Sequence, residues 1–255
     1  MSRLRSFSAV ALLAVAALFL VARSSTPSAD SGLEGQVASL SSRLMTLEGQ
    51  IGALEKRIAR NHPDANAQQE AVRLFQSISA QVDQGRAEEA RSQMAAFQEE
   101  YGGTQVAQRA LALEAEIAVI GRPAPATWGV DKWYQGESEI DLTSDGPTLV
   151  IFWETWCPHC RREVPKLEAL YNRYKDTGFQ IVGLTRLTRN TTDQQLIDFA
   201  AQQKLSYPLA KENGTIAQQF GVNGVPAAAV VKGGIIIWRG HPARVSPAMI
   251  DAWLK

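Results

Sequence analysis

Residues 152–165 read FWETWCPHCRREVP and contain both cysteines of a 255-residue chain, Cys157 and Cys160. The stretch continues the apolar run TLVIFW (148–153), which is typical of a strand buried on both faces. It leads into CRREVPKLEALYNRYKDTG, a helical pattern in which we expect Pro165 to introduce a kink. A cysteine pair between a strand and a helix is compatible with a metal site, a structural disulfide or a redox centre.

The spacing of the two cysteines suits dithiol chemistry. A cysteine in the first turn of a helix lies in the partial positive charge of the helix N-terminus, which stabilises the thiolate over the thiol. A second cysteine three residues later lies one turn along the helix, close enough to attack a mixed disulfide. We therefore assign Cys157 as the nucleophile and Cys160 as the resolving thiol.

Strands and helices alternate through the rest of the C-terminal part. The expected elements are, in chain order, a buried strand FQIVGLT (179–185), a helix that opens with the capping pattern Thr191–Gln194 and runs to about Lys204, a short strand YPLA, a short helix TIAQQFG closed by Gly221, a hairpin of VPAAAVV (225–231) and IIIWRG (235–240), and a final helix with Ser246 as N-cap and Pro247 at its first position.

The residues around the cysteines resemble a known family. FWETWCPHC, with GVNGVPA downstream, resembles a thioredoxin fold, and WCPHCRREVPKLEALYNRY is similar to the TlpA/ResA family of membrane-anchored, extracytoplasmic thiol–disulfide oxidoreductases. The resemblance covers about residues 121–255 and depends on Trp156 before the pair, Glu163 after it and Val225-Pro226 downstream. It implies an α/β thioredoxin-like fold, a central mixed sheet flanked by helices.

The resemblance also implies roles for single residues. Pro226 matches the family's cis-proline, whose loop lies against the disulfide, and Val225 before it would offer its backbone to an extended substrate; the alternative is a trans proline at the start of a strand. Glu163 matches an acidic residue that moves a proton to or from the resolving thiol, although a glutamate there could also be simply solvated. Thioredoxin keeps a buried aspartate on the preceding strand, where this chain has Ile151.

Pro158-His159 departs from the pattern of many relatives, because CPHC is the pair of the strongly oxidising DsbA. We expect His159 to donate to the Cys157 thiolate and, when protonated, to pair with it, which stabilises the reduced form and makes the disulfide a better oxidant. Known potentials span about −270 mV for thioredoxin to about −120 mV for DsbA. The family favours a reductant and the dipeptide an oxidant or isomerase, so the direction of electron flow stays open.

The N-terminus predicts export. Arg3 and Arg5 precede an uncharged run from Ser6 to Ala22, which favours a membrane anchor or signal peptide over residues 1–24 rather than a buried helix of a soluble protein. The polar stretch STPSADSG (25–32) is the expected linker. We expect the chain in the cell envelope, anchored on the periplasmic side of the inner membrane, or in the periplasm if the signal is cleaved. Dithiol chemistry suits that oxidising compartment.

Residues 33–60 show a heptad pattern. Apolar side chains alternate spacings of four and three residues at Leu33, Val37, Leu40, Leu44, Leu47, Ile51, Leu54 and Ile58. A β-branched residue at most a positions and leucine at every d position favour a parallel two-stranded coiled coil and hence a homodimer. The alternative, one amphipathic helix packed on its own chain, would follow a period of 3.6 residues rather than 3.5.

Residues 63–120 are expected to be helical throughout, with Val72, Phe75, Ile78 and Val82 on one inward face. Part of this segment faintly resembles a tetratricopeptide helix pair, little more than one repeat. A packing or spacing role is expected ahead of partner recognition. The prolines and glycines of GRPAPATWG (121–129) indicate a boundary before the C-terminal domain.

The leading function is thus disulfide exchange with exported proteins that contain cysteines, together with a redox partner in the membrane. A net charge of +0 gives no reason to expect nucleic acid, and no cofactor or metal is required. The alternative is a Cu(I) metallochaperone that uses Cys157 and Cys160, with His159 as an accessory ligand. A structural zinc site is poorer because only His62 and His241 remain as nitrogen ligands outside the motif. A peroxidase would need a cysteine in a Pro/Thr-rich loop, which the sequence lacks.

Overall fold

The computed structural model of the protein describes residues 30–61, 65–125, 129–136 and 140–255, and the chain divides into two compact units, 1–59 and 60–255. The expected membrane anchor (1–24) and residues 25–29 of the expected linker lie outside the described residues. Within the described ranges, no helix combines the length and apolar character needed to cross a membrane.

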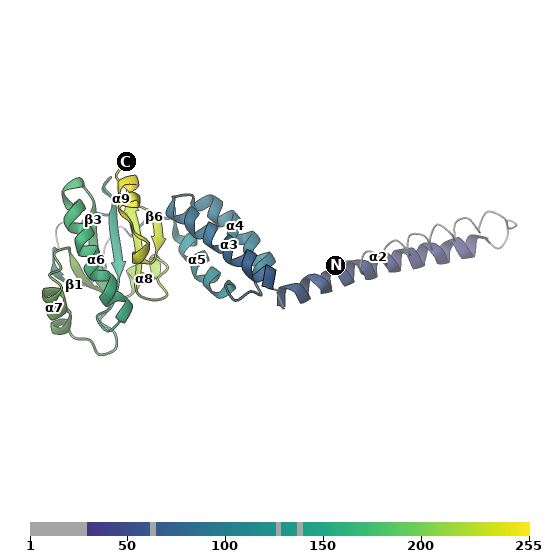
Figure 1. Ribbon diagram of the computed structural model, residues 1–255, viewed down its shortest axis with the longest axis horizontal. Helices are drawn as coiled ribbons and strands as arrows, with labels where there is room; N and C mark the ends of the chain where they lie inside the picture. The colour runs from purple at the N-terminus through teal and green to yellow at the C-terminus, as the bar shows by residue number, and fades with distance from the viewer. Residues whose placement is uncertain (1–29, 62–64, 126–128, 137–139) are drawn as a thin grey trace. The chain divides into compact units, whose positions relative to one another are not determined.

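The first unit is described by one long helix, α2 (Asp30–Asn61), drawn in purple in Figure 1. It begins inside the stretch 25–32 that was expected to be a linker and continues through the predicted heptads. Six side chains of the heptad pattern are more than half exposed, namely Leu40, Leu44, Leu47, Ile51, Leu54 and Ile58. The single chain therefore leaves this apolar seam in contact with solvent.

The second unit begins with three helices, α3 (Ala65–Asp83), α4 (Ala87–Tyr101) and α5 (Ala107–Val119). They bury Ile78, Met94, Phe97, Leu113 and Ile117 between them. The inward face predicted for α3 was wrong at one position, because Val72 is 40% exposed and Ala71 is fully buried instead. Ala71 lies two helical turns before Ile78 on the same face of α3, so the buried face includes a small residue in place of Val72.

The rest of the unit is a six-stranded mixed sheet in the order β1-β4-β3-β2-β5-β6. Its strands are β1 (Val130–Gln135), β2 (Thr148–Phe152), β3 (Gln180–Thr185), β4 (Leu209–Glu212), β5 (Ala227–Lys232) and β6 (Ile235–Gly240). The pairs β2–β3 and β3–β4 are parallel, and the pairs β1–β4, β2–β5 and β5–β6 are antiparallel. All five residues of the central strand β2 are buried, as its apolar run predicts.

Helices cover both faces of the sheet. On one face, the core contains Leu149 and Ile151 of β2 and Trp153, the residue after the strand. They pack with α6 (Pro158–Tyr174), α7 (Asp193–Gln202) and α9 (Pro247–Trp253). Val150 and Phe152 pack on the other side, against α8 (Thr215–Gln219). Two short 3-10 turns, η2 (Lys175–Thr177) and η3 (Pro242–Arg244), complete the elements. The central mixed sheet with flanking helices agrees with the expected thioredoxin-like architecture.

Local details differ from the sequence expectation. The capping box of α7 is Thr192 with Gln195, one residue later than predicted, and α6 continues through Pro165 to Tyr174. The final helix has Ser246 as N-cap and Pro247 at its start, as predicted. The strand β1 was not predicted; its half-exposed sequence VDKWYQ lacks the continuous apolar run of a buried strand.

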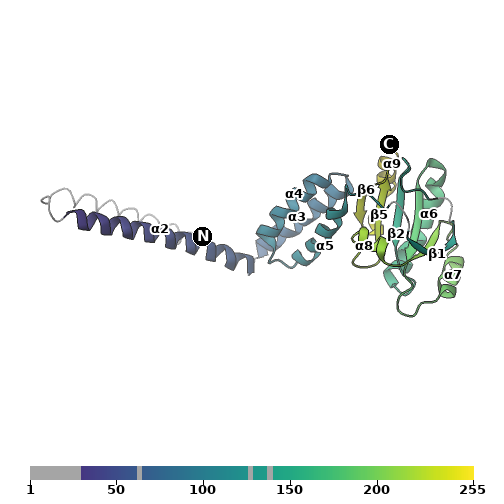
Figure 2. The same ribbon diagram turned by 180° about the vertical axis from the view of Figure 1, so that it is seen from behind.

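The stretch expected to be a boundary is hydrogen-bonded along the outer edge of β6. The Gly121 N–H donates to Ile236 O at 2.8 Å, the Ile236 N–H donates to Arg122 O at 3.0 Å, and the Ala124 N–H donates to Gly234 O at 2.8 Å. Residues 121–124 therefore connect α5 to the sheet without a flexible gap. Both views show α3 and α5 beside β6 (Figures 1 and 2).

Arg244, in η3, makes polar contacts with the helices α3 and α5. Its guanidinium donates to Asp83 Oδ1 of α3 at 2.7 Å, to Glu116 Oε2 of α5 at 3.1 Å and to the Ser79 carbonyl at 3.1 Å. The indole of Trp238, on β6, donates to the same Asp83 oxygen at 3.1 Å. Burial is the main cause that raises the pKa of Glu116, and the nearby arginines oppose it.

We expect Arg244→Ala to lower the free energy of unfolding by about 2 kcal/mol, because Asp83 and Glu116 would keep their partly buried carboxylates without their cationic partner. Urea denaturation of the full chain measures the change. Arg86→Ala is the matched control: its ion pair with Glu89 is about half exposed and should contribute less than about 1 kcal/mol. Equal effects of the two substitutions would show that Arg244 does not hold the helices to the sheet.

Candidate active site around Cys157 and Cys160

Cys157 is the N-cap residue of α6. Its backbone is extended (φ −80°, ψ 114°), its Sγ accepts the Cys160 N–H at 3.3 Å, and Pro158 begins the helix. The Cys157 N–H donates back to the Glu154 carbonyl at 3.1 Å, which closes the turn between β2 and α6. The sulfur therefore lies at the positive end of the helix with a direct N–H donor, an arrangement that stabilises a thiolate.

Cys160 lies one turn further and is completely buried, whereas Cys157 retains 4% exposure. Burial is the main cause that raises the pKa of the Cys160 thiol far above its usual range, and its hydrogen bond with Cys157 acts in the same direction. Both cysteines are reduced in this structure. The two thiols thus differ in environment, and the raised pKa of the Cys160 thiol keeps that group protonated.

The loop before β5 approaches the nucleophile. The Val225–Pro226 peptide bond is cis, in agreement with the resemblance, and the Cys157 thiol donates to Val225 O with Sγ and O 3.7 Å apart. The loop is brought there by sheet register, because Ala227 of β5 pairs with Phe152 at the end of β2. Buried Arg239, which the sequence analysis did not single out, braces the neighbouring backbone by donating to Phe220 O at 3.0 Å and Ala228 O at 3.3 Å.

Glu163 lies on α6 with its side chain only 11% exposed. Both of its oxygens accept from Lys166 Nζ, at 3.0 and 3.1 Å, so the carboxylate is ion-paired rather than freely solvated. The same carboxylate influences His241, which follows β6. Burial lowers the pKa of the His241 imidazole, and the negative charge of Glu163 opposes this shift. Glu163 is thus paired with a cation of its own helix.

His159 is exposed at the start of α6, and its recorded hydrogen bond is with Arg162 rather than with Cys157. Arg162 Nη2 lies 2.6 Å from His159 Nδ1. Because arginine carries only donors, this ring nitrogen is the acceptor. The histidine therefore holds a guanidinium beside the first turn of the helix.

Trp156, next to the nucleophile, is held by the loop that follows β3. Its indole N–H donates to Thr188 Oγ1 at 3.0 Å, and the Arg189 guanidinium carbon lies 3.7 Å from its ring centroid. This loop contains three non-glycine residues with positive φ, namely Leu187, Arg189 and Asn190. The Trp156 indole is thus held by Thr188 and Arg189, which lie outside the CPHC motif.

Glu154 anchors that loop, and the sequence analysis did not assign it a role. Its side chain is buried and accepts the backbone N–H groups of Arg186 at 3.2 Å and Thr188 at 3.2 Å, together with the Thr185 hydroxyl at 3.3 Å. A carboxylate directly after a buried strand is the sequence signal that could have drawn attention to it, since a buried charge needs nearby donors.

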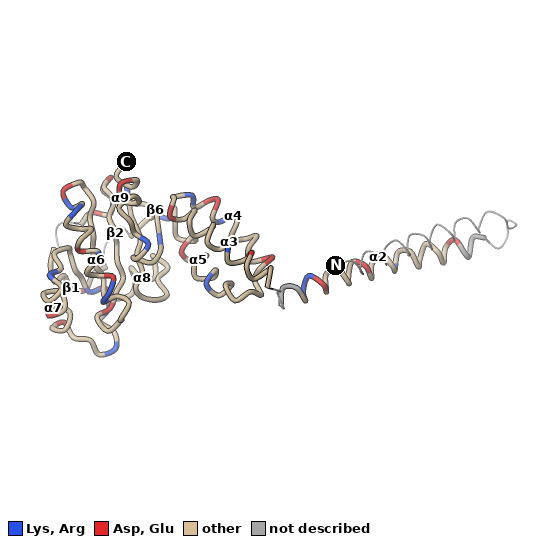
Figure 3. The backbone as a smooth tube through the Cα atoms, in the orientation of Figure 1, with Lys and Arg blue, Asp and Glu red and all other residues tan. Residues whose placement is uncertain are grey.

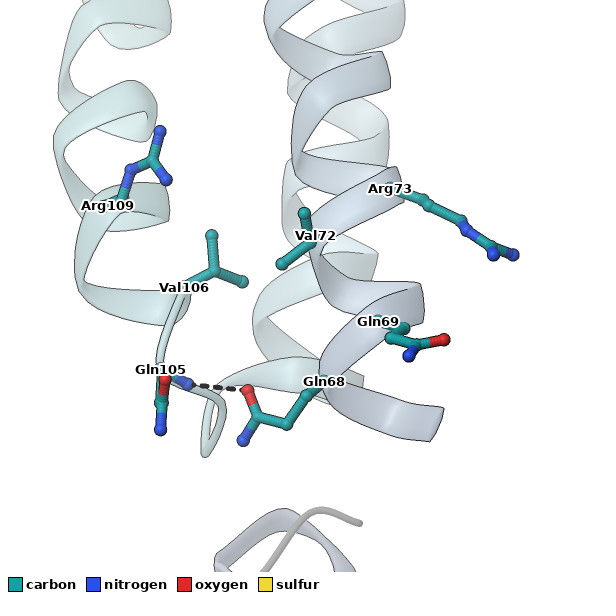
Figure 4. Close-up of a pocket in the computed structure, with 7 residues that line it drawn as sticks. All are labelled: Gln68, Gln69, Val72, Arg73, Gln105, Val106 and Arg109. Carbon is teal, nitrogen blue, oxygen red and sulfur yellow. Dashed lines mark hydrogen bonds between the residues drawn. The ribbon is translucent and has the colours of Figure 1, made fainter. Parts of the chain in front are cut away.

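Two clefts flank Trp156. One, of about 430 Å³, lies toward α7, and the other, of about 410 Å³, lies toward Arg186 and the cis-proline loop at Val225. A further hollow of about 560 Å³ belongs to α3 and α5 (Figure 4). It is lined by glutamine, valine and arginine side chains, and Arg73 points away from it; no cysteine or carboxylate lines it. Unlike this hollow, both of the other clefts are lined by Trp156, the residue before Cys157.

Known proteins resemble the C-terminal part of the chain. Residues 120–239 match the AhpC/TSA family. Thiol-disulfide oxidoreductase ResA of Halalkalibacterium halodurans is 27% identical over 48% of this chain and 68% of its own length, and ResA of Bacillus thuringiensis is 33% identical over 44% and 63%. The match thus spans about two thirds of these relatives. The crystal structure of StoA from Bacillus subtilis aligns with a TM-score of 0.43 at 21% identity, over 51% of this chain and 100% of that one. The C-terminal domain is thus similar in sequence to the AhpC/TSA family and to curated thiol–disulfide oxidoreductases.

Proposed function

We propose that this protein exchanges disulfides with exported, cysteine-containing proteins through Cys157 and Cys160. The observation that carries the proposal is the position of the Cys157 sulfur, which accepts the Cys160 N–H at the start of α6 and lies 3.7 Å from the Val225 carbonyl of the cis-proline loop. An extended substrate that lies along this carbonyl would present its own sulfur to the nucleophile.

The exchange proceeds in two displacements. In the reducing direction, the Cys157 thiolate attacks one sulfur of a substrate disulfide, forms a mixed disulfide and releases the other substrate sulfur as a thiolate. Cys160 then loses its proton and attacks the Cys157 sulfur, which forms the Cys157–Cys160 disulfide and releases the second substrate sulfur. Two electrons pass from the protein to the substrate, and oxidation of a substrate dithiol is the reverse sequence.

The second displacement needs a base, because burial raises the pKa of the Cys160 thiol. We assign this role to Glu163, which follows Cys160 on α6 and is mostly shielded from solvent. Both of its oxygens accept from Lys166 Nζ, so the carboxylate is already paired with a cation. In the reverse direction the protonated acid returns the proton to Cys160.

The N-terminal sequence supports an extracytoplasmic place for this chemistry, with residues 1–24 as the anchor or signal and a membrane protein as the redox partner. The exposed heptad side chains of α2 support pairing of two copies. Two dithiols would then act on one substrate, which suits isomerisation of wrongly paired disulfides.

The Cys160→Ser variant should accumulate mixed disulfides with client proteins, since Cys157 can still attack but the second displacement is blocked. Non-reducing electrophoresis of envelope proteins, with and without reductant, detects them. Cys157→Ser is the matched control and should trap nothing. If neither variant traps a client, while reduced protein takes up one Cu(I) and fails to reduce insulin, the dithiol carries copper instead.

We expect His159→Ala and Arg162→Ala each to make the reduction potential more negative by about 20–30 mV, because the first removes the side chain that orients the Arg162 guanidinium at the start of α6 and the second removes that positive charge. Equilibration with glutathione buffers of known ratio measures the potential. Arg173→Ala, at the far end of α6, should leave it unchanged. A wild-type value near that of thioredoxin makes the protein a reductant, and one near that of DsbA makes it an oxidant or isomerase.

The proposed dimer predicts twice the monomer mass for the full chain in detergent, measured by sedimentation equilibrium. Leu47→Lys with Leu54→Lys should convert it to monomers, because two charges would be buried at d positions. Leu111→Lys is the control, an equally exposed leucine on α5 outside the heptads. A monomer mass for the wild-type chain would exclude pairing through α2.

A further inference from the structure

The cleft between Trp156 and α7 contains two arginines. Arg161 comes from the first turn of α6 and Arg189 from the loop after β3, and both line this cleft of about 430 Å³. The lining includes Thr155 and Trp156, the two residues that precede the nucleophile in the chain. A substrate segment next to its own reacting cysteine would pass this cleft.

Both guanidinium groups are already oriented. Arg161 lies over the Phe199 ring, with its guanidinium carbon 5.6 Å from the centroid, and Arg189 lies over the Trp156 ring at 3.7 Å. Stacking holds the flat face of arginine and leaves the N–H donors at its rim available. Little side-chain freedom would be lost when an anion binds.

Neither arginine has a carboxylate partner in any ion pair among the described residues. One carboxylate, Asp198, lines the cleft and accepts from Gln194 at 2.8 Å. Elsewhere on the described chain, both signs of charge are interspersed (Figure 3). The cleft therefore keeps an excess positive charge next to the dithiol.

The loop that carries Arg189 is anchored by hydrogen bonds to Glu154, which follows β2. The buried Glu154 carboxylate accepts the N–H groups of Arg186 and Thr188, and Thr188 in turn holds the Trp156 indole. The backbone at Arg189 is left-handed (φ 55°), so the side chain leaves the loop in a direction that a regular extended strand would not give. The positive charge is thus part of an anchored surface rather than of a loose loop.

We propose that this cleft is a specificity subsite for a carboxylate, and that the preferred substrates are polypeptides with an acidic residue beside the reacting cysteine. The inference rests on the proposed disulfide exchange and names its substrate class. Arginine suits the role because its planar group can donate two parallel hydrogen bonds to one carboxylate. Oxidised glutathione carries the same chemistry, so the test must separate the two sources.

The test measures kcat/KM for reduction of three synthetic peptide disulfides that differ only in the residues flanking cysteine: glutamate, glutamine or lysine. We expect the glutamate peptide to exceed the glutamine peptide by about five- to tenfold and the lysine peptide to be the slowest. The preference should shrink in 1 M salt, where charges are screened beyond about 3 Å.

Variants assign the preference to the cleft. Arg161→Met and Arg189→Met should each lower the glutamate-to-glutamine ratio of kcat/KM by about threefold, whereas Arg189→Lys should keep most of it. Arg173→Met is the matched control, because Arg173 is also an exposed arginine stacked on an aromatic ring, Tyr174, but lies at the other end of α6.

The outcomes are distinct. A ratio near one in the wild type, or a ratio that survives in the Arg161→Met, Arg189→Met double variant, overturns the subsite while leaving disulfide exchange intact. Failure to exchange with any of the three peptides, whether as disulfides with the reduced protein or as dithiols with the oxidised protein, contradicts the proposed function itself. If the double variant slows reduction of oxidised glutathione and leaves the peptide ratio unchanged, the cleft serves a small thiol and the polypeptide proposal is wrong.

Discussion

The active site depends on the pairing of β2 along both of its edges. Phe152, at its end, is level with Leu184 of β3 on one side and Ala227 of β5 on the other. Three loops consequently lie at the same end of these neighbouring strands: the turn with Cys157, the loop that carries Arg189, and the cis-proline loop. A shift of register by one residue would turn the apolar side chains of β2 to the wrong faces and separate these loops.

This arrangement explains why the sequence was informative about the dithiol. The apolar run of β2, the helix pattern after it and the later hairpin are local signals, and each was predicted close to its observed bounds. Once a strand, a cysteine pair and a helix follow directly, the sulfur must lie at the helix N-terminus. Val225-Pro226 came from resemblance, since the sequence by itself does not distinguish a cis from a trans proline.

The features that were missed arise from contacts between distant segments. Glu154 satisfies donors some thirty residues away, and a pattern of apolar and polar residues carries no sign of that partnership. The strand β1 is only half buried, because it is added to the edge of the sheet beside β4. The buried face of α3 includes the small residue Ala71 rather than Val72, which the spacing of the larger apolar residues does not indicate. His159 turned toward Arg162, a neighbour on its own helix, rather than toward the thiolate.

The short hydrogen-bonded run from Gly121 to Ala124 has a consequence for how the protein resists aggregation. An outer strand with free N–H and C=O groups is a template onto which another extended chain can add, and this is a route to aggregation. Residues 121–124 occupy part of that template along β6, with α3 and α5 beside it. This part of β6 is therefore unavailable for strand addition by another extended chain.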